Sequence, residues 1–132
     1  MNAIDTNILV QYLVHDDPGQ WMQATRLIEN CEQKGERLYI PFAVFIETMW
    51  VVGSIFNSSR SAIYEVMEKL TRAPVFLIES SELIKVAIII GPRENLDPAD
   101  ALIALSARQA GCECTLTFDR KAARSHLFKL LR

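Results

Sequence analysis

Short apolar runs alternate with amphipathic stretches along the chain, and this alternation constrains the fold more than any other feature. Residues 1–4, 38–40, 75–78 and 113–117 are predicted to be short strands, and 128–131 is a fifth candidate. The stretches between them carry apolar residues at helical spacing. Strands that alternate with helices are typical of an α/β domain with a parallel sheet. We therefore expect a three-layer α/β/α sandwich, in which helices cover both faces of a mostly parallel central sheet.

Pro, Gly and small polar residues mark where the helices should begin and end. Residues 80–90 are expected to form a helix that ends in a polar loop at 91–95. Asp97 directly precedes Pro98 and is expected to cap the following helix through its side-chain oxygen. Cys112 and Cys114 are two positions apart and would alternate on one strand, so we expect them to share a face turned to the core.

Length and composition indicate a single globular domain over residues 1–132. Half of the residues are hydrophobic and 23% are charged, which allows a real core and argues against disorder. No apolar run reaches the length of a membrane span, and the N-terminus as written has no basic leader. Three cysteines form a sparse, odd-numbered set that suits a reducing compartment. We expect a cytoplasmic protein that is not embedded in a membrane.

Four acidic residues stand where a parallel α/β fold places ligands. Asp5 follows the first strand, Asp119 follows the fourth, and Asp100 lies in the first turn of a helix. Glu47 lies in the apolar helix that follows the second strand. Ligands bind beyond the carboxyl ends of such strands, where the four acids would repel one another. A hard divalent cation such as Mg²⁺ or Mn²⁺ would remove this repulsion.

Each acid also has a purely structural interpretation. Asp5 is a possible helix cap, Asp119 a possible turn residue, and Asp100 a favourable charge near a helix N-terminus. Glu47 could pair with a lysine, although its apolar setting favours a specific buried partner. Taken singly these signals are weak, so the prediction rests on the four acids as a set.

Several segments resemble the PIN-domain ribonucleases. The similarity lies in residues 4–8, in Glu47 within its apolar helix, in residues 97–104, in Gly111 and in residues 116–121. It extends over essentially the whole chain, and the length is similar to that of the VapC branch, the toxins of bacterial and archaeal toxin–antitoxin pairs. The resemblance implies an α/β/α sandwich and a metal-dependent endoribonuclease that cleaves RNA.

The resemblance also implies roles for individual residues. The family's acidic quartet, which binds Mg²⁺ or Mn²⁺ and acts in catalysis, carries over onto Asp5, Glu47, Asp100 and Asp119. Supporting polar positions carry over onto Thr6, Asn7 and Thr117. The resemblance further implies a small antitoxin protein as partner and a homodimer.

Four acids repel phosphate, so affinity for RNA must come from other residues. The net charge is −2, with 14 basic and 16 acidic residues, which neither supports nor excludes a nucleic-acid substrate. Arg120, Lys121 and Arg124 lie just after Asp119 and are the nearest candidates for RNA binding. A solvated basic turn explains these three residues equally well.

Two other enzyme or signalling classes fit the sequence poorly. A receiver-like Mg²⁺-binding signalling module without nuclease activity needs a phosphoacceptor Asp after the middle strand, where this chain has Glu79. A haloacid-dehalogenase-like phosphatase needs a second Asp two residues after the first, where this chain has Asn7. A pure protein-binding module remains compatible with the antitoxin partner that the resemblance implies.

Overall fold

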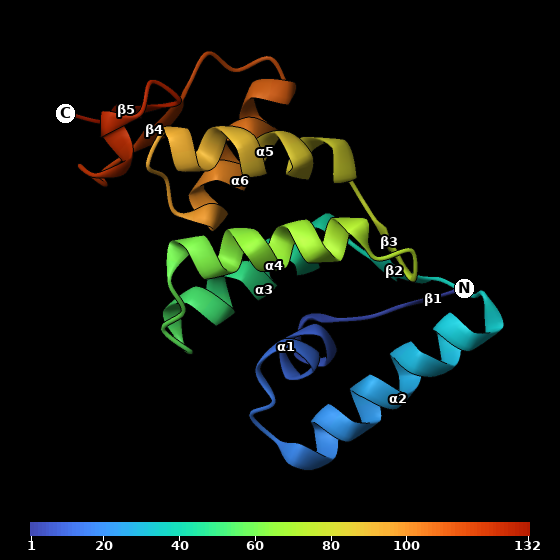
Figure 1. Cartoon of the computed structure of the whole chain (residues 1–132). Coiled ribbons are helices and arrows are strands. Elements are labelled where there is room, and N and C mark those ends of the chain that lie inside the picture. The colour runs from blue at the N-terminus through green and yellow to red at the C-terminus, as the bar shows by residue number, and fades with distance from the viewer. The chain divides into compact units, whose positions relative to one another are not determined.

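A computed structural model describes all 132 residues of the chain (Figure 1). The chain forms two compact units, an N-terminal unit of Met1–Ser81 and a C-terminal unit of Glu82–Arg132. None of the helices has the length and apolar character needed to cross a membrane.

A three-stranded parallel sheet organises the N-terminal unit. Its strands are β1 (Asn2–Ala3), β2 (Leu38–Ile40) and β3 (Phe76–Ile78), in the order β1-β2-β3. Leu38 and Ile40 in the central strand are fully buried, while Tyr39 between them is partly exposed. The sheet therefore forms a short apolar core layer, and the carboxyl ends of its three strands all lie at one edge.

Four helices complete this unit: α1 (Thr6–Val14), α2 (Pro18–Lys34), α3 (Phe42–Ser54) and α4 (Arg60–Arg72). Helix α1 packs against α2 and α3, and α3 packs against α4. Figure 1 shows α1, in dark blue, lying beside α2. The helices bury apolar side chains, among them Leu9, Phe45 and Met67, which are completely inaccessible to solvent. Burial of these faces is the main stabilising contribution expected for short helices of this kind.

The C-terminal unit combines two helices with a second parallel sheet. Its elements are α5 (Ser81–Arg93), α6 (Pro98–Gln109), β4 (Thr115–Thr117), a 3-10 helix η1 (Ala122–Arg124) and β5 (Phe128–Leu130). Strands β4 and β5 pair in parallel, with Leu116 opposite Lys129. The α/β class, the parallel pairing and the fifth strand are therefore as predicted.

Helix α5 departs from the sequence prediction, because it continues through part of the expected loop at 91–95. It ends at Arg93 and contains Pro92 in its last turn. Proline lacks an N–H and normally breaks a helix interior. The turn is closed here by hydrogen bonds from Glu94 N to the Ile90 carbonyl at 2.9 Å and from Leu96 N to the Gly91 carbonyl at 3.0 Å. Proline is accommodated near the end of the helix, where few intrahelical bonds depend on it.

The prediction that Cys112 and Cys114 share a core face is wrong. Both residues precede β4; Cys112 is exposed and Cys114 is only partly buried. Gly111, with φ of 97°, turns the chain after α6, so this segment is a connection and not part of the strand. Trp50 on α3 is also exposed and does not belong to the core.

Hydrogen bonds to Glu94 connect the end of α5 to the segment before β5. Its Oε1 atom accepts hydrogen bonds from the Ser125 hydroxyl at 2.7 Å and from the His126 backbone N–H at 3.3 Å, and it lies 2.8 Å from His126 Nδ1. The Ser125 hydrogen bond, followed by the interactions with His126, lowers the pKa of Glu94 below its ordinary value. Sequence inspection missed this cluster, since Glu94 is 31 positions from Ser125 and 32 from His126.

Candidate active site

The carboxyl edge of the N-terminal sheet collects three acidic positions. Asp5 follows β1, Glu47 lies on the helix that follows β2, and Glu79 follows β3. All strand pairs are parallel, so their carboxyl ends meet at the same edge. This is the edge at which α/β folds bind ligands.

Asp5 is both a helix cap and a candidate ligand. Its Oδ1 atom accepts a hydrogen bond from Ile8 N at 3.3 Å, so it caps α1 as the structural interpretation anticipated. The cap uses one carboxylate oxygen, and a carboxylate retains a second oxygen for a cation. Capping therefore orients the exposed Asp5 side chain without removing its capacity to bind a metal.

Thr6 and Glu47 form a direct contact between α1 and α3. The Thr6 hydroxyl donates a hydrogen bond to Glu47 Oε1, although the two residues are 41 positions apart. This bond places the Glu47 carboxylate beside the residue that follows Asp5. Glu47 does have a specific partner, but the prediction that this partner is buried is wrong, because Thr6 is only partly buried and Glu47 itself is exposed. The helix is apolar on the faces that pack, and Glu47 lies on the remaining face.

Glu79 is a third acid at this edge, and sequence analysis did not predict its contact with α3. Its Oε1 atom accepts a hydrogen bond from the Phe42 backbone N–H at 2.8 Å. Helix α3 begins after Pro41, which cannot cap it with a side chain, and Glu79 supplies the missing acceptor from the neighbouring strand. The sequence did contain a signal for Glu79, because this acid follows the third strand in the same way as Asp5 follows the first.

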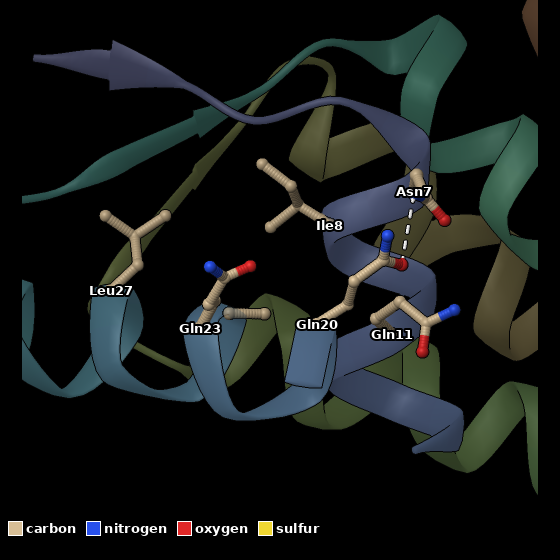
Figure 2. Close-up of a pocket in the computed structure, with 7 residues that line it drawn as sticks. Asn7, Ile8, Gln11, Gln20, Gln23 and Leu27 are labelled. Atoms are coloured by element: carbon tan, nitrogen blue, oxygen red, sulfur yellow. Dashed lines mark hydrogen bonds between the residues drawn. The ribbon is translucent and has the colours of Figure 1, made fainter. Parts of the chain in front are cut away.

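Asn7 turns toward α2. Its side-chain amide donates to Gln20 Oε1 at 3.5 Å, which is drawn as the dashed line in Figure 2. Together with Ile8, Gln11 and Gln23 it lines a cavity of about 290 Å³ between α1 and α2. The observed role of Asn7 is thus in helix contact, and its predicted support of the acids stays a prediction.

In the C-terminal unit, Asp119 occupies a tight turn after β4. Its backbone N–H donates to the Thr117 hydroxyl at 2.9 Å. Its Oδ1 atom accepts from the backbone N–H groups of Lys121 at 2.8 Å and Ala122 at 3.3 Å. Thr117 therefore holds the backbone of Asp119 and the turn holds its carboxylate, which again retains one oxygen for a ligand.

Asp100 and Asp97 lie at the start of α6. Asp100 is in the first turn, as predicted, and its side chain is partly buried. Asp97 occupies the N-cap position, but the predicted side-chain cap is wrong, because its carboxylate makes no capping hydrogen bond. Pro98 at the first helical position has no N–H, which reduces the number of donors that need a cap.

The predicted RNA-binding residues surround η1. Arg120, Lys121 and Arg124 are all exposed. Arg120 and Arg124 line an open cavity in the C-terminal unit that also includes Lys129 and Arg132. The basic residues are therefore more numerous at this surface than the predicted three.

The quartet is divided between the two units. Asp5 and Glu47 are brought together in the N-terminal unit, and Asp100 and Asp119 belong to the C-terminal unit. Neither unit contains a cluster of three or more His, Cys, Asp or Glu side chains that could hold a metal ion. Two of the four acids thus belong to each unit, and their joint role as metal ligands remains a prediction.

Comparison with known proteins decides the family. The PIN domain model matches residues 3–125, a span that includes all four acids and crosses the boundary between the two units. The chain belongs to the PIN domain family. One similar protein is the "VapC ribonuclease" of Aquifex aeolicus (strain VF5), which is 26% identical over 121 residues. The match covers 92% of this chain and 89% of that relative. The resemblance to the PIN domain, first seen in short motifs, is therefore confirmed.

Proposed function

We propose that this protein is a metal-dependent endoribonuclease that hydrolyses phosphodiester bonds in RNA and acts as the toxin of a toxin–antitoxin pair. The observation that carries the proposal is the Thr6–Glu47 hydrogen bond beside Asp5, at the ligand-binding edge of a parallel sheet in a PIN domain. The name of the similar Aquifex protein, VapC ribonuclease, supports the same activity. A receiver-like module is not favoured, since the chain belongs to another family.

The donor chemistry of the candidate site fits a hard divalent cation. Asp5, Glu47, Asp100 and Asp119 offer only carboxylate oxygens, which Mg²⁺ and Mn²⁺ prefer, and no His or Cys is among them. Asp5 and Asp100 would be the principal ligands, with Asp119 and Glu47 binding directly or through water. When bound, such an ion polarises a phosphoryl oxygen and lowers the pKa of a coordinated water.

The protein's own residues would position the reacting groups. Thr6 holds the Glu47 carboxylate in one orientation, which suits it to accept a proton from the attacking water. Thr117 and the turn at 119–122 hold Asp119 in the same way. Arg120, Lys121 and Arg124 would bind the RNA backbone and offset the repulsion between phosphate and the acids.

The proposal extends to partners and location. A toxin of this type requires a small antitoxin protein, and we propose that the chain forms a homodimer in the cytoplasm. A neighbouring reading frame that encodes a small protein with a DNA-binding pattern would support the toxin assignment.

Cleavage of a structured RNA with and without metal tests the proposed activity. We expect cleavage with Mg²⁺ or Mn²⁺ and none with EDTA. Glu47→Gln should lower the rate at least a hundredfold, the usual contribution of a general base. Glu65→Gln, which changes an exposed acid on α4, is the matched control and should cleave at the wild-type rate. Undiminished cleavage in EDTA, or by Glu47→Gln, would overturn the proposal.

A further inference from the structure

An open groove crosses the β4–β5 side of the C-terminal unit. Its main cavity, of about 890 Å³, runs along β4, η1 and β5 to the last residue. A second cavity, of about 490 Å³, shares Arg120, Leu130, Leu131 and Arg132 with the first and reaches Phe118. The two cavities therefore form one continuous surface, which we call the β4–β5 groove.

The charge of this groove is entirely positive. Arg120, Arg124, Lys129 and Arg132 line it, and no acidic residue does. This excess contrasts with the whole chain, whose net charge is −2. A groove lined by four cationic side chains and no acidic side chain is complementary to a polyanion. Three of the cations are arginines, whose planar guanidinium groups bind phosphate oxygens in pairs.

The groove also exposes a large aromatic side chain. Phe118 is 79% exposed, more than any other large hydrophobic residue except Met1. It lies between Thr117 and Asp119, directly after β4. Leu116, on the exposed face of β4 opposite Lys129, is 60% exposed and extends the apolar surface. Exposed aromatic residues beside arginines are the elements with which proteins bind unpaired bases.

We propose that the β4–β5 groove binds single-stranded RNA, with phosphates on the four cations and one unpaired base stacked on Phe118. The assignment rests on the proposed function and names the form of RNA that reaches the same site. In a duplex each base face is covered by its neighbours, so Phe118 can stack only on a base in a single strand or loop. Phe118 precedes Asp119 directly, so a base stacked there lies next to a proposed metal ligand.

An acidic protein segment is the rival occupant. It would satisfy the four cations, but it has no need of a flat aromatic face. Phe118 therefore distinguishes the two occupants: RNA binding depends on the aromatic ring, whereas binding of an acidic peptide depends on charge alone.

Binding of a fluorescein-labelled single-stranded RNA to the full chain, measured by anisotropy in EDTA, tests the groove without cleavage. Phe118→Leu should weaken binding about tenfold, the effect expected for one stacked base, and Phe118→Trp should preserve it. Ile103→Ala, at an exposed apolar residue of α6 outside the groove, is the matched control.

Salt dependence tests the cations. Arg124→Ala and Lys129→Ala should each lower the slope of log affinity against log salt by about 0.7, the contribution of one phosphate contact on a single strand. Arg108→Ala removes the same charge from the last turn of α6, outside the groove, and should leave the slope unchanged. The complementary duplex should bind more weakly than the single strand.

Three results would overturn the groove assignment. The first is that Phe118→Leu binds the RNA as tightly as the wild type, and the second is that the duplex binds as tightly as the single strand. The third is that polyglutamate displaces the RNA completely while Phe118→Leu has no effect. The last result would assign the groove to an acidic protein. Because binding is measured in EDTA, it does not require a bound metal ion or cleavage. RNA binding without metal-dependent cleavage would reject the nuclease proposal but support RNA binding in the β4–β5 groove. Metal-dependent cleavage together with unchanged RNA binding by the groove variants would support the nuclease proposal but reject the groove assignment.

Discussion

Asp97 and Asp100 are three residues apart at the start of α6, and the structure separates their roles. Asp97 is at the N-cap position with φ of −58° and ψ of 139°, yet its carboxylate makes no capping hydrogen bond. Asp17 before α2 offers a direct contrast, because it also precedes a proline and does accept a hydrogen bond from Gln20 N at 3.1 Å. The same residue type in the same sequence context therefore caps one helix and not the other.

This contrast predicts different costs of removing the two carboxylates. Asp17→Ala should lower the free energy of unfolding by about 1 kcal/mol, the usual penalty for a lost cap. Asp97→Ala should change it by less than about 0.5 kcal/mol, as expected of a substitution that breaks no cap. Urea unfolding of the two variants beside the wild type measures both values. Equal losses would mean that Asp97 caps α6 in solution.

Asp100 is the residue of this pair on which cleavage should depend. Asp100→Asn should abolish most RNA cleavage, because a neutral amide is a much poorer ligand for a hard cation than a carboxylate. Asp97→Asn serves as the matched control and should cleave normally. Cleavage rates at saturating Mn²⁺ decide between them. Loss of activity in Asp97→Asn alone would reverse the assignment, and normal activity in both would exclude Asp100 from the site.

At the scale of elements, the start of α3 depends on a residue from another part of the chain. Glu79 after β3 accepts the hydrogen bond of Phe42 N, 37 positions away. This contact joins β3 to the helix that carries Glu47, so it sets where the candidate base stands relative to the sheet edge.

Removing this contact should loosen α3. We expect Glu79→Ala to lower the free energy of unfolding by about 1 kcal/mol, the usual cost of losing a helix cap. Glu79→Gln, which keeps a side-chain carbonyl acceptor, should lose less. Thermal unfolding with Glu65→Ala as an exposed acidic control measures the difference. No difference between Glu79→Ala and the control would mean that α3 does not need this cap.

The connection from α5 to the segment before β5 should make stability depend on pH. The pKa of Glu94 is lowered in the folded state, first by the hydrogen bond from Ser125. A depressed carboxyl pKa contributes stability above the unfolded value, about 4.3, and this contribution is lost as the pH falls through the lowered pKa. Wild type should therefore be more stable than Glu94→Gln at neutral pH, and this difference should diminish at acid pH, where the Glu94 carboxyl becomes protonated. Urea midpoints that differ equally at neutral and acid pH would contradict this.

At the scale of the whole molecule, two of the proposed metal ligands belong to each unit. A cation that binds the folded site and not the unfolded chain stabilises the fold, by about 2.7 kcal/mol at a hundredfold excess over its dissociation constant. We expect Mn²⁺ to raise the melting temperature of the wild type. Glu47→Gln and Asp119→Asn, which alter one unit each, should both reduce the shift. A shift that persists undiminished in both variants would place the metal elsewhere.

Local sequence patterns were sufficient for most of the secondary structure. The predicted strand at 38–40 matches β2, and helix α2 begins at Pro18 and ends before Gly35, because apolar periodicity, a proline at a helix start and a glycine at its end act within a few residues. The same local logic placed Asp5 and Asp119 at strand ends. Positions of candidate ligands were thus predictable from sequence, since a strand and the turn after it are neighbours in the chain.

Contacts between distant residues were decided by the tertiary structure alone. The Thr6–Glu47 hydrogen bond, the Glu79 contact with α3 and the groove that gathers Arg124, Lys129 and Phe118 each depend on how helices and strands pack. Periodicity shows which face of an element is apolar, but it carries no information on which polar residue of another element lies opposite. Sequence alone therefore determined the α/β class and the candidate acids, whereas packing determined the partners that orient them, because those partners meet only after the apolar faces are buried.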